Sequence, residues 1–187
     1  MYSHIKKKNV LIFVTSLLIL MQANFCHSKS VFDVKAAYLY NFIKFISWPS
    51  IESASTTDNQ INKASVFNLC LLGEDPSYKK LSLLDKRPIH GHTLTIKSIP
   101  KFSPSDDCKV LYIGASEERF LNNILPRIHS TPILTLSSIP NFANLGGTIG
   151  FITLGNVVRF NINLKQAEAT QLSISSKLLE LANKVVR

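Results

Sequence analysis

The segment that decides the fold runs from Val66 to Pro76 and reads VFNLCLLGEDP. Its residues up to Leu72 form a nearly continuous apolar run that stops at Gly73, which is typical of a strand buried on both faces of a parallel sheet. Asp75 followed by Pro76 indicates a helix start, because it combines an N-cap side chain with a proline at the first helical position. A buried strand followed directly by a helix predicts one unit of an α/β domain.

The same alternation of strands and helices continues towards the C-terminus. His90–Ile99 alternates in hydropathy like a strand, and Val110–Ile113 and Ile133–Leu136 have the apolar runs of two further buried strands. Between the last two, Glu117 and Glu118 favour the first turn of a helix, where acidic side chains interact well with the helix dipole. This order of elements predicts a mainly parallel sheet with helices packed on it.

The C-terminal part predicts a hairpin followed by a helical region. Two alternating segments flank Gly155–Asn156, which has the form of a two-residue hairpin turn with glycine first. Asn163 is the expected N-cap of a helical region that continues through Leu181. We therefore expect a layered α/β/α domain with a mainly parallel sheet and an antiparallel C-terminal hairpin at the edge of that sheet.

The segment before the first strand predicts an unusual helix. Ser30 and Asp33 have the spacing of a capping box, and Pro49 restricts Trp48 to extended backbone, so the helix is expected to end near Ser47. Apolar residues occupy nearly all of its circumference, which requires burial on more than one side. Part of the helix is therefore expected to contact a partner or a second copy of the chain, with ordinary core packing as the alternative. The polar segment that follows, residues 51–64, is expected to be a loop.

The first residues have the composition of a secretory signal peptide. Lys6–Lys8 form a basic block, an apolar run follows over residues 10–21, and small or polar residues come next. The apolar run is shorter than the about 20 residues of a comfortable transmembrane helix. We expect cleavage after Ser28, or else after Ser30, and an uncleaved membrane anchor is the alternative. The remaining residues 29–187 have the length of a single domain.

The composition excludes several classes of protein. A hydrophobic fraction of 45% excludes a disordered chain. The chain has 21 Lys and Arg against 12 Asp and Glu, but the block Lys6–Lys8 belongs to the expected leader. The other basic residues are scattered and do not form the basic stripe with interleaved aromatic residues that binding to nucleic acid requires. We therefore expect no nucleic-acid partner.

The cysteines indicate a disulfide. Cys26 belongs to the expected leader, which leaves Cys70 and Cys108 in the exported chain. An even pair in an exported chain is typical of a disulfide in an oxidising compartment. Two cysteines this far apart do not form a zinc site by themselves. A nucleophilic cysteine that acts with a histidine is the alternative.

The sequence motifs do not indicate an enzyme. Gly146–Gly147 leads into a strand and not into a helix N-terminus, so it lacks the free amides that hold a phosphate. A Ser-x-x-Lys match at Ser98 contains Pro100, which prevents the helical turn that such hydrolases need. His90 and His92 share one face of a predicted strand, but no third metal ligand is identifiable. We expect no catalytic residue, no metal and no cofactor.

One place in the predicted sheet is suited to a small ligand. Gly73–Asp75 and Gly114–Ser116 each follow a buried strand, and open α/β sheets bind ligands in the crevice at the carboxyl ends of their strands. A phosphate-receiver pocket is excluded, because the second of these strands ends in glycine and not in the aspartate that such a pocket phosphorylates. A small-ligand-binding protein is therefore an alternative function.

The segment from Val34 to Pro49, VKAAYLYNFIKFISWP, resembles the opening of the YfiR-like family of exported bacterial proteins. Individually weaker matches follow in order, so that the resemblance covers essentially the whole expected mature chain. These matches are Leu71–Pro76, Cys108–Ile113, Ile133–Ser137, Gly146–Phe151, Phe160–Asn163 and Ser176–Leu179.

The resemblance implies a periplasmic regulator that is not an enzyme. Such a protein contacts an inner-membrane diguanylate cyclase, or a related membrane sensor, and represses cyclic-di-GMP signalling and biofilm formation. The resemblance also places Cys70 and Cys108 where the family has one stabilising disulfide. The best-known member has a second disulfide in the C-terminal strand region, and this chain has no cysteines there. A homodimer is a further expectation, because the first helix is so apolar.

We expect the membrane partner to contact the first helix and the surface around Trp48. Core packing of Trp48 and Phe151, and simple solvation of Arg159, are the alternatives for those three residues. The candidate contact residues are Tyr38, Phe42, Phe45, Trp48, Phe151 and Arg159.

Overall fold

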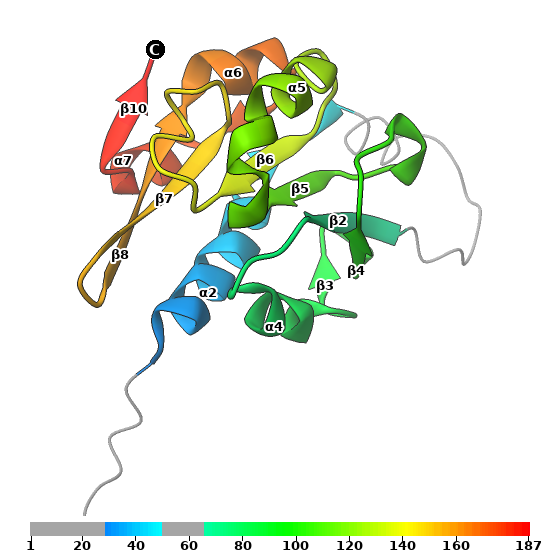
Figure 1. The fold of residues 1–187 in the computed structure, drawn as a ribbon, viewed down its shortest axis with the longest axis horizontal. Helices are drawn as coiled ribbons and strands as arrows, with labels where there is room; N and C mark the ends of the chain where they lie inside the picture. Colours follow the sequence, from blue (N-terminus) through cyan, green and yellow to red (C-terminus); the bar gives the residue numbers. More distant parts are fainter. Residues whose placement is uncertain (1–28, 50–65) are drawn as a thin grey trace, which may run out of the picture.

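The computed structural model describes residues 29–49 and 66–187. The expected signal peptide and the expected loop over residues 51–64 lie outside this part. The described chain contains an eight-stranded sheet with the strand order β10-β8-β7-β6-β5-β2-β4-β3 (Figure 1). Its strands are β2 (Val66–Leu72), β3 (Pro88–Ile89), β4 (His92–Ile99), β5 (Val110–Ile113), β6 (Leu134–Ser137), β7 (Ile149–Leu154), β8 (Val157–Asn163) and β10 (Lys184–Val186).

The sheet is mainly parallel. The neighbouring strands from β4 through β2, β5 and β6 to β7 all pair in parallel, whereas β7 pairs with β8, and β3 with β4, in antiparallel fashion. The predicted fold class is therefore confirmed. The hairpin of β7 and β8 lies one strand inside the edge, because the short strand β10 pairs in parallel with the outer side of β8.

Helices cover both faces of the sheet. The helix α2 packs on one face together with α4, whereas α5 packs on the other. The bounds of the helices are α2 (Val31–Lys44), α4 (Tyr78–Leu81), α5 (Leu121–Ile124), α6 (Leu164–Ala169) and α7 (Ser176–Leu181). Short 3-10 helices, Ser82–Leu84, Ala115–Phe120 and Leu125–Arg127, extend α4 and flank α5.

The strand β2 is buried on both faces, as its apolar run predicts. Its side chains alternate between the faces, because successive residues of a strand point in opposite directions. Leu69 and Leu71 belong to the core on the α2 side, whereas Cys70 and Leu72 belong to the core on the α5 side. This one strand therefore contributes to both hydrophobic cores.

The helix α2 begins where the sequence predicts and ends earlier. Ser30 Oγ accepts a hydrogen bond from the backbone N–H of Asp33 at 3.2 Å, and the Asp33 carboxylate accepts one from the backbone N–H of Ser30 at 3.1 Å, which completes the capping box. The expectation that the helix reaches Ser47 is wrong. Residues Ile46–Ser47 form the strand β1, which pairs with β9 (Ser173–Ile174), so extended pairing replaces the last helical turn.

The C-terminal region differs from the expectation of a continuous helical region. Gly155 and Asn156 form the turn between β7 and β8, and Asn163 caps α6 by accepting a hydrogen bond from Gln166 N–H at 2.9 Å, both as predicted. After α6 the chain forms the strand β9, then α7, and finally β10 at the edge of the sheet. The predicted helical region is thus two short helices separated by a strand.

Candidate functional site

The structure joins Cys70 to Cys108 in a disulfide, with 5.8 Å between the two Cα atoms. Cys70 lies in β2, and Cys108 lies just before β5, which is the parallel neighbour of β2. Both residues are buried in the hydrophobic core on the α5 side. Because both sulfur atoms are bonded, a nucleophilic role for either cysteine does not apply to this structure.

Two of the candidate contact residues belong to an aromatic cluster in the core. Phe42 of α2 is 1% exposed, and its ring lies 4.7 Å from the ring of Phe160 and 5.7 Å from that of Phe151, between ring centroids. Phe151 is also buried. Their rings bury each other between α2 and the hairpin, which favours core packing over the expected contact of Phe42 and Phe151 with a partner.

Trp48 is also a core residue. Its indole ring packs edge-on against Phe67 of β2, with 5.1 Å between ring centroids, and only 1% of the residue is exposed. Its Nε1–H donates a hydrogen bond to the Lys109 carbonyl at 3.2 Å, so the polar atom of the buried ring is satisfied. Trp48 therefore fixes the chain after α2 to the sheet, which favours the alternative of core packing over a partner contact.

Tyr38 of α2 and Phe45, the C-cap residue that follows α2, are candidate residues that remain accessible. Phe45 is 39% exposed, and Tyr38 is half-buried against Phe42 and Phe160. The helix α7 runs beside them, because Ser175 donates its N–H to the Phe45 carbonyl at one end and Asn183 donates its N–H to the Phe160 carbonyl at the other.

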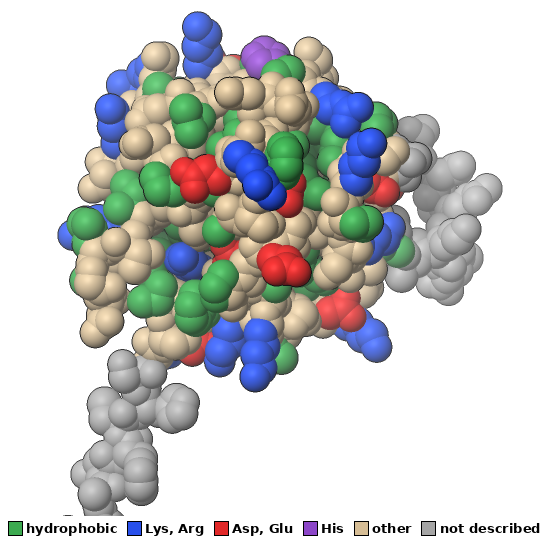
Figure 2. All heavy atoms as spheres, in the orientation of Figure 1, with side chains coloured by type: hydrophobic (Ala, Val, Ile, Leu, Met, Phe, Trp, Pro, Cys, Tyr) green, Lys and Arg blue, Asp and Glu red, His purple; other side chains and the backbone are tan. Residues whose placement is uncertain are grey.

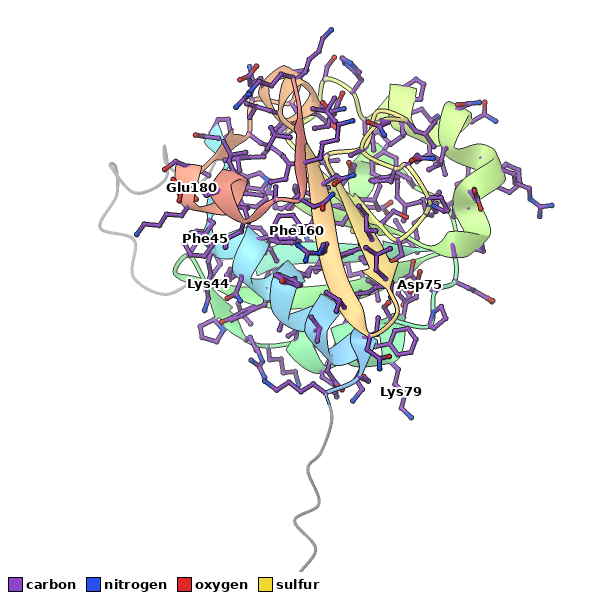
Figure 3. The ribbon with its side chains drawn as sticks, turned by 90° about the vertical axis from the view of Figure 1, so that its left-hand side faces the viewer. Lys44, Phe45, Asp75, Lys79, Phe160 and Glu180 are labelled. Carbon is purple, nitrogen blue, oxygen red and sulfur yellow. A yellow bond between two sulfur atoms is a disulfide. The ribbon has the colours of Figure 1, made fainter. Side chains whose placement is uncertain are left out.

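Together these elements form what we call the α2–α7 surface. In Figure 3, Lys44, Phe45 and Glu180 lie on one side of the molecule, away from Asp75 and Lys79. Leu181 of α7 is 68% exposed and adds a second large apolar side chain. By the α2–α7 surface we mean the following accessible side chains of these two neighbouring segments: Tyr38, Asn41, Lys44, Phe45, Glu180 and Leu181.

Arg159 lies on a different surface. The ring of its neighbour Phe160 points towards α2, so Arg159 points to the opposite face of the sheet. It is exposed there, and its partner across the hairpin is Ile152. The structure therefore does not bring Arg159 together with Phe45, although both residues are accessible.

A buried polar cluster fixes α2 to the carboxyl ends of β5 and β6. Lys35 Nζ donates a hydrogen bond to Ser138 Oγ at 2.8 Å, and the hydroxyl groups of Tyr112 and Ser138 lie 2.8 Å apart. Burial lowers the pKa of the Lys35 ammonium, against the opposing effect of the Asp75 charge, and burial raises the pKa of Tyr112 to about 12. Lys35 is 6% exposed and Tyr112 is fully buried, so the cluster is closed to a substrate and acts as a structural tether.

This cluster was not predicted from the sequence, although the sequence contains one signal of it. Lys35 lies off the polar stripe that Asp33, Asn41 and Lys44 form along α2, so its side chain points towards the sheet. A charged residue on the apolar side of a helix requires a polar partner in the core. Ser138, which lies just after β6, supplies this partner.

The predicted crevice between the loops after β2 and β5 is bridged. Ser116 Oγ accepts a hydrogen bond from the Glu74 N–H at 2.8 Å, and Gly114 N–H donates to the Leu72 carbonyl at 2.8 Å. A Cβ atom at Gly114 would collide with the backbone of Glu74 and with the Tyr78 hydroxyl, so this close approach requires glycine. The space between these two loops is therefore occupied by the loops themselves.

The sequence model of the YfiR/HmsC-like family matches residues 32–183. The chain belongs to this family. The match includes most of α2, both disulfide cysteines and almost all of the sheet. It confirms the family that the resemblance indicates. A search of curated proteins finds no match.

In this YfiR/HmsC-like protein His90 and His92 do not lie in one strand, contrary to the expectation. His90 lies in the turn before β4, where its Nε2 donates a hydrogen bond to the Ile43 carbonyl at 2.6 Å, whereas His92 lies in β4. Across residues 29–49 and 66–187, no three His, Cys, Asp or Glu side chains are grouped to hold a metal ion. Of the helices in the same two ranges, none has the length and hydropathy needed to cross a membrane.

Proposed function

We propose that this YfiR/HmsC-like protein is a periplasmic regulator, not an enzyme, that represses an inner-membrane diguanylate cyclase or a related membrane sensor by direct contact. Repression would lower cyclic-di-GMP signalling and biofilm formation. The observation that carries the proposal is the family match over residues 32–183. Two further features support export: the leader-like composition of residues 1–28 and the disulfide, which is stable in an oxidising compartment.

We propose the α2–α7 surface as the contact surface for the membrane partner. Phe45 and Leu181 expose a large part of their apolar side chains, and such anchors carry much of the energy of protein interfaces. Lys44, whose Nζ lies 4.2 Å from the centroid of the Tyr40 ring, and Glu180 supply the charged rim that surrounds an apolar interface centre. The partner segment that fits this surface is apolar at its centre with charged groups at its edge.

The core below supports this surface. Tyr38 stacks on Phe42, with 5.7 Å between ring centroids, and Phe42 in turn packs against Phe151 and Phe160 of the hairpin. The capping box at Ser30 fixes the start of the helix. The accessible side chains therefore project from a rigid element, which reduces the conformational entropy that is lost on binding.

Site-specific photocrosslinking in living cells tests the contact. A photoreactive phenylalanine analogue at position 45 is expected to crosslink to a membrane protein that carries a diguanylate cyclase or sensor domain, identified by mass spectrometry. The same analogue in place of Val157, which is 53% exposed at the start of β8, is the matched control and is expected to give no such product. A crosslink between two copies of the chain at position 45 would instead show that this surface forms the homodimer.

A further inference from the structure

A cavity of about 340 Å³ opens on the α5 side of the sheet, at the carboxyl ends of β2 and β4. A second hollow of about 420 Å³ continues from it and shares Lys101, Phe102 and Arg127 with it. Figure 2, in the orientation of Figure 1, shows Lys and Arg side chains beside apolar ones on the side of the molecule that faces the viewer. The cavity lies next to the bridged loops after β2 and β5, since Leu72 and Glu117 line it.

The inner wall of the cavity is apolar and fixed in place. Leu72 and Phe102 line it and belong to the same buried core as the disulfide, and the partly buried Ile124 packs against that core. Phe120 is 42% exposed and extends this wall towards solvent. A wall of this kind accepts the apolar body of a ligand without rearrangement.

The mouth of the cavity carries two cations. Lys101 and Arg127 are both exposed, and neither forms an ion pair with an acidic residue of the described chain. Glu117 is the one acidic residue in the lining, and its Oε1 accepts a hydrogen bond from Ser116 Oγ at 3.1 Å. Two unpaired cations beside an apolar wall are suited to a carboxylate, which a guanidinium and an ammonium bind through charge-assisted hydrogen bonds.

We propose that this cavity binds a small organic anion with an apolar body, an aryl or acyl carboxylate. The body packs against Leu72, Phe102 and Phe120, and the carboxylate lies between Lys101 and Arg127. The volume of the cavity is in the range of known small-molecule sites. The site lies across the sheet from the α2–α7 surface, so a ligand and a protein partner can bind at the same time. The proposal does not rest on the proposed regulatory function.

Titration calorimetry on the purified oxidised protein tests the charge requirement. We expect 2-naphthoate to bind saturably with one site per chain, and the uncharged 2-naphthamide to bind at least roughly tenfold more weakly. The double variant K101Q/R127Q is expected to lose about tenfold or more of the affinity for 2-naphthoate. The matched control K177Q/K184Q removes two exposed charges elsewhere and is expected to leave binding unchanged.

A second variant tests the apolar wall. Phe120→Ala removes a half-exposed ring and is expected to weaken binding of 2-naphthoate severalfold, whereas Leu145→Ala, which removes a side chain of similar exposure outside the cavity, leaves it unchanged. The proposal is overturned if 2-naphthoate shows no saturable binding, if the amide binds equally well, or if K177Q/K184Q weakens binding as much as K101Q/R127Q. None of these outcomes would contradict the proposed contact with a membrane protein, because photocrosslinking at position 45 tests that contact separately.

Discussion

At the scale of single residues, Cys70 and Cys108 constrain the unfolded chain most strongly. The disulfide closes a loop with a sequence separation of 38 residues, for which loop-closure entropy gives a stabilisation of roughly 4 kcal/mol. We expect a reductant to lower the free energy of unfolding by about 3–4 kcal/mol in urea titrations. The variant C70A/C108A is the control and is expected to be insensitive to the reductant. An equal effect of the reductant on both proteins would contradict this role.

Asp33 makes the stability depend on pH. Its hydrogen bond with Lys80, followed by those with Ser30, lowers the pKa of the carboxyl from 3.8 to about 2. The unfolded chain therefore binds more protons in this range, and the contribution of Asp33 to stability is lost as the pH falls from about 4 to 2. We expect the free energy of unfolding to fall less steeply over this range in Asp33→Asn. Identical slopes in urea titrations of the two proteins would contradict the assignment.

Lys35 is a buried cation with an uncharged partner. Its desolvation is costly, and replacing a buried charge by an apolar residue of similar length is often neutral or stabilising. Lys35→Met is therefore expected to keep or increase the free energy of unfolding. Ser138→Ala leaves the ammonium without its hydrogen bond and is expected to cost about 1–3 kcal/mol. A larger loss in Lys35→Met than in Ser138→Ala would show that the lysine itself stabilises the fold.

At the scale of elements, α2 and its C-cap carry a buried aromatic ring, Phe42, which we expect to stabilise the fold, and an exposed one, Phe45, which we expect to contribute little to stability. Phe42→Ala removes a buried ring from the aromatic cluster and is expected to lower the free energy of unfolding by about 3–5 kcal/mol. Phe45→Ala removes an exposed ring three positions further on and is expected to cost less than about 1 kcal/mol. Thermal or urea unfolding of both variants measures the contrast. Similar losses would mean that Phe45 also belongs to the core.

The elements that could be predicted from the sequence are those whose own residues carry a clear hydropathy pattern or a clear spacing of capping residues. β2 and the hairpin turn follow from continuous or alternating hydropathy, and the capping box at Ser30 follows from local spacing. The short strands β1, β9 and β10 could not be predicted in the same way. Each has two or three residues, and its conformation depends on a pairing partner that lies far away in the sequence.

The candidate site was harder to predict than the fold. A helix that is apolar on nearly every side gives no signal of which side faces the core, so Phe42 and Phe45 look alike in the sequence. The structure separates them through the ring contacts of Phe42 with the hairpin. The cavity near Arg127 was not predicted, because its lining comes from three segments that only the folded sheet brings together.

At the scale of the whole molecule, the sheet separates two accessible regions with different chemistry. The α2–α7 surface lies on one face and combines large apolar side chains with a charged rim. The cavity with Lys101 and Arg127 lies on the other face, beside the disulfide-bonded core. β2 connects them, because its side chains contribute to both cores. We expect the first region to contact the membrane protein and the second to bind a small anion.

The most direct test of the proposed repression is the cellular level of cyclic-di-GMP, measured by mass spectrometry in a strain that lacks the gene. We predict a raised level that returns to normal with the wild-type protein and with the control variant L154E/V157E, whose substitutions lie at the exposed end of the hairpin. The variant F45E/L181E, present at the same amount, is predicted to leave the level raised. An unchanged level in the deletion strain, or full repression by F45E/L181E, would contradict the proposal.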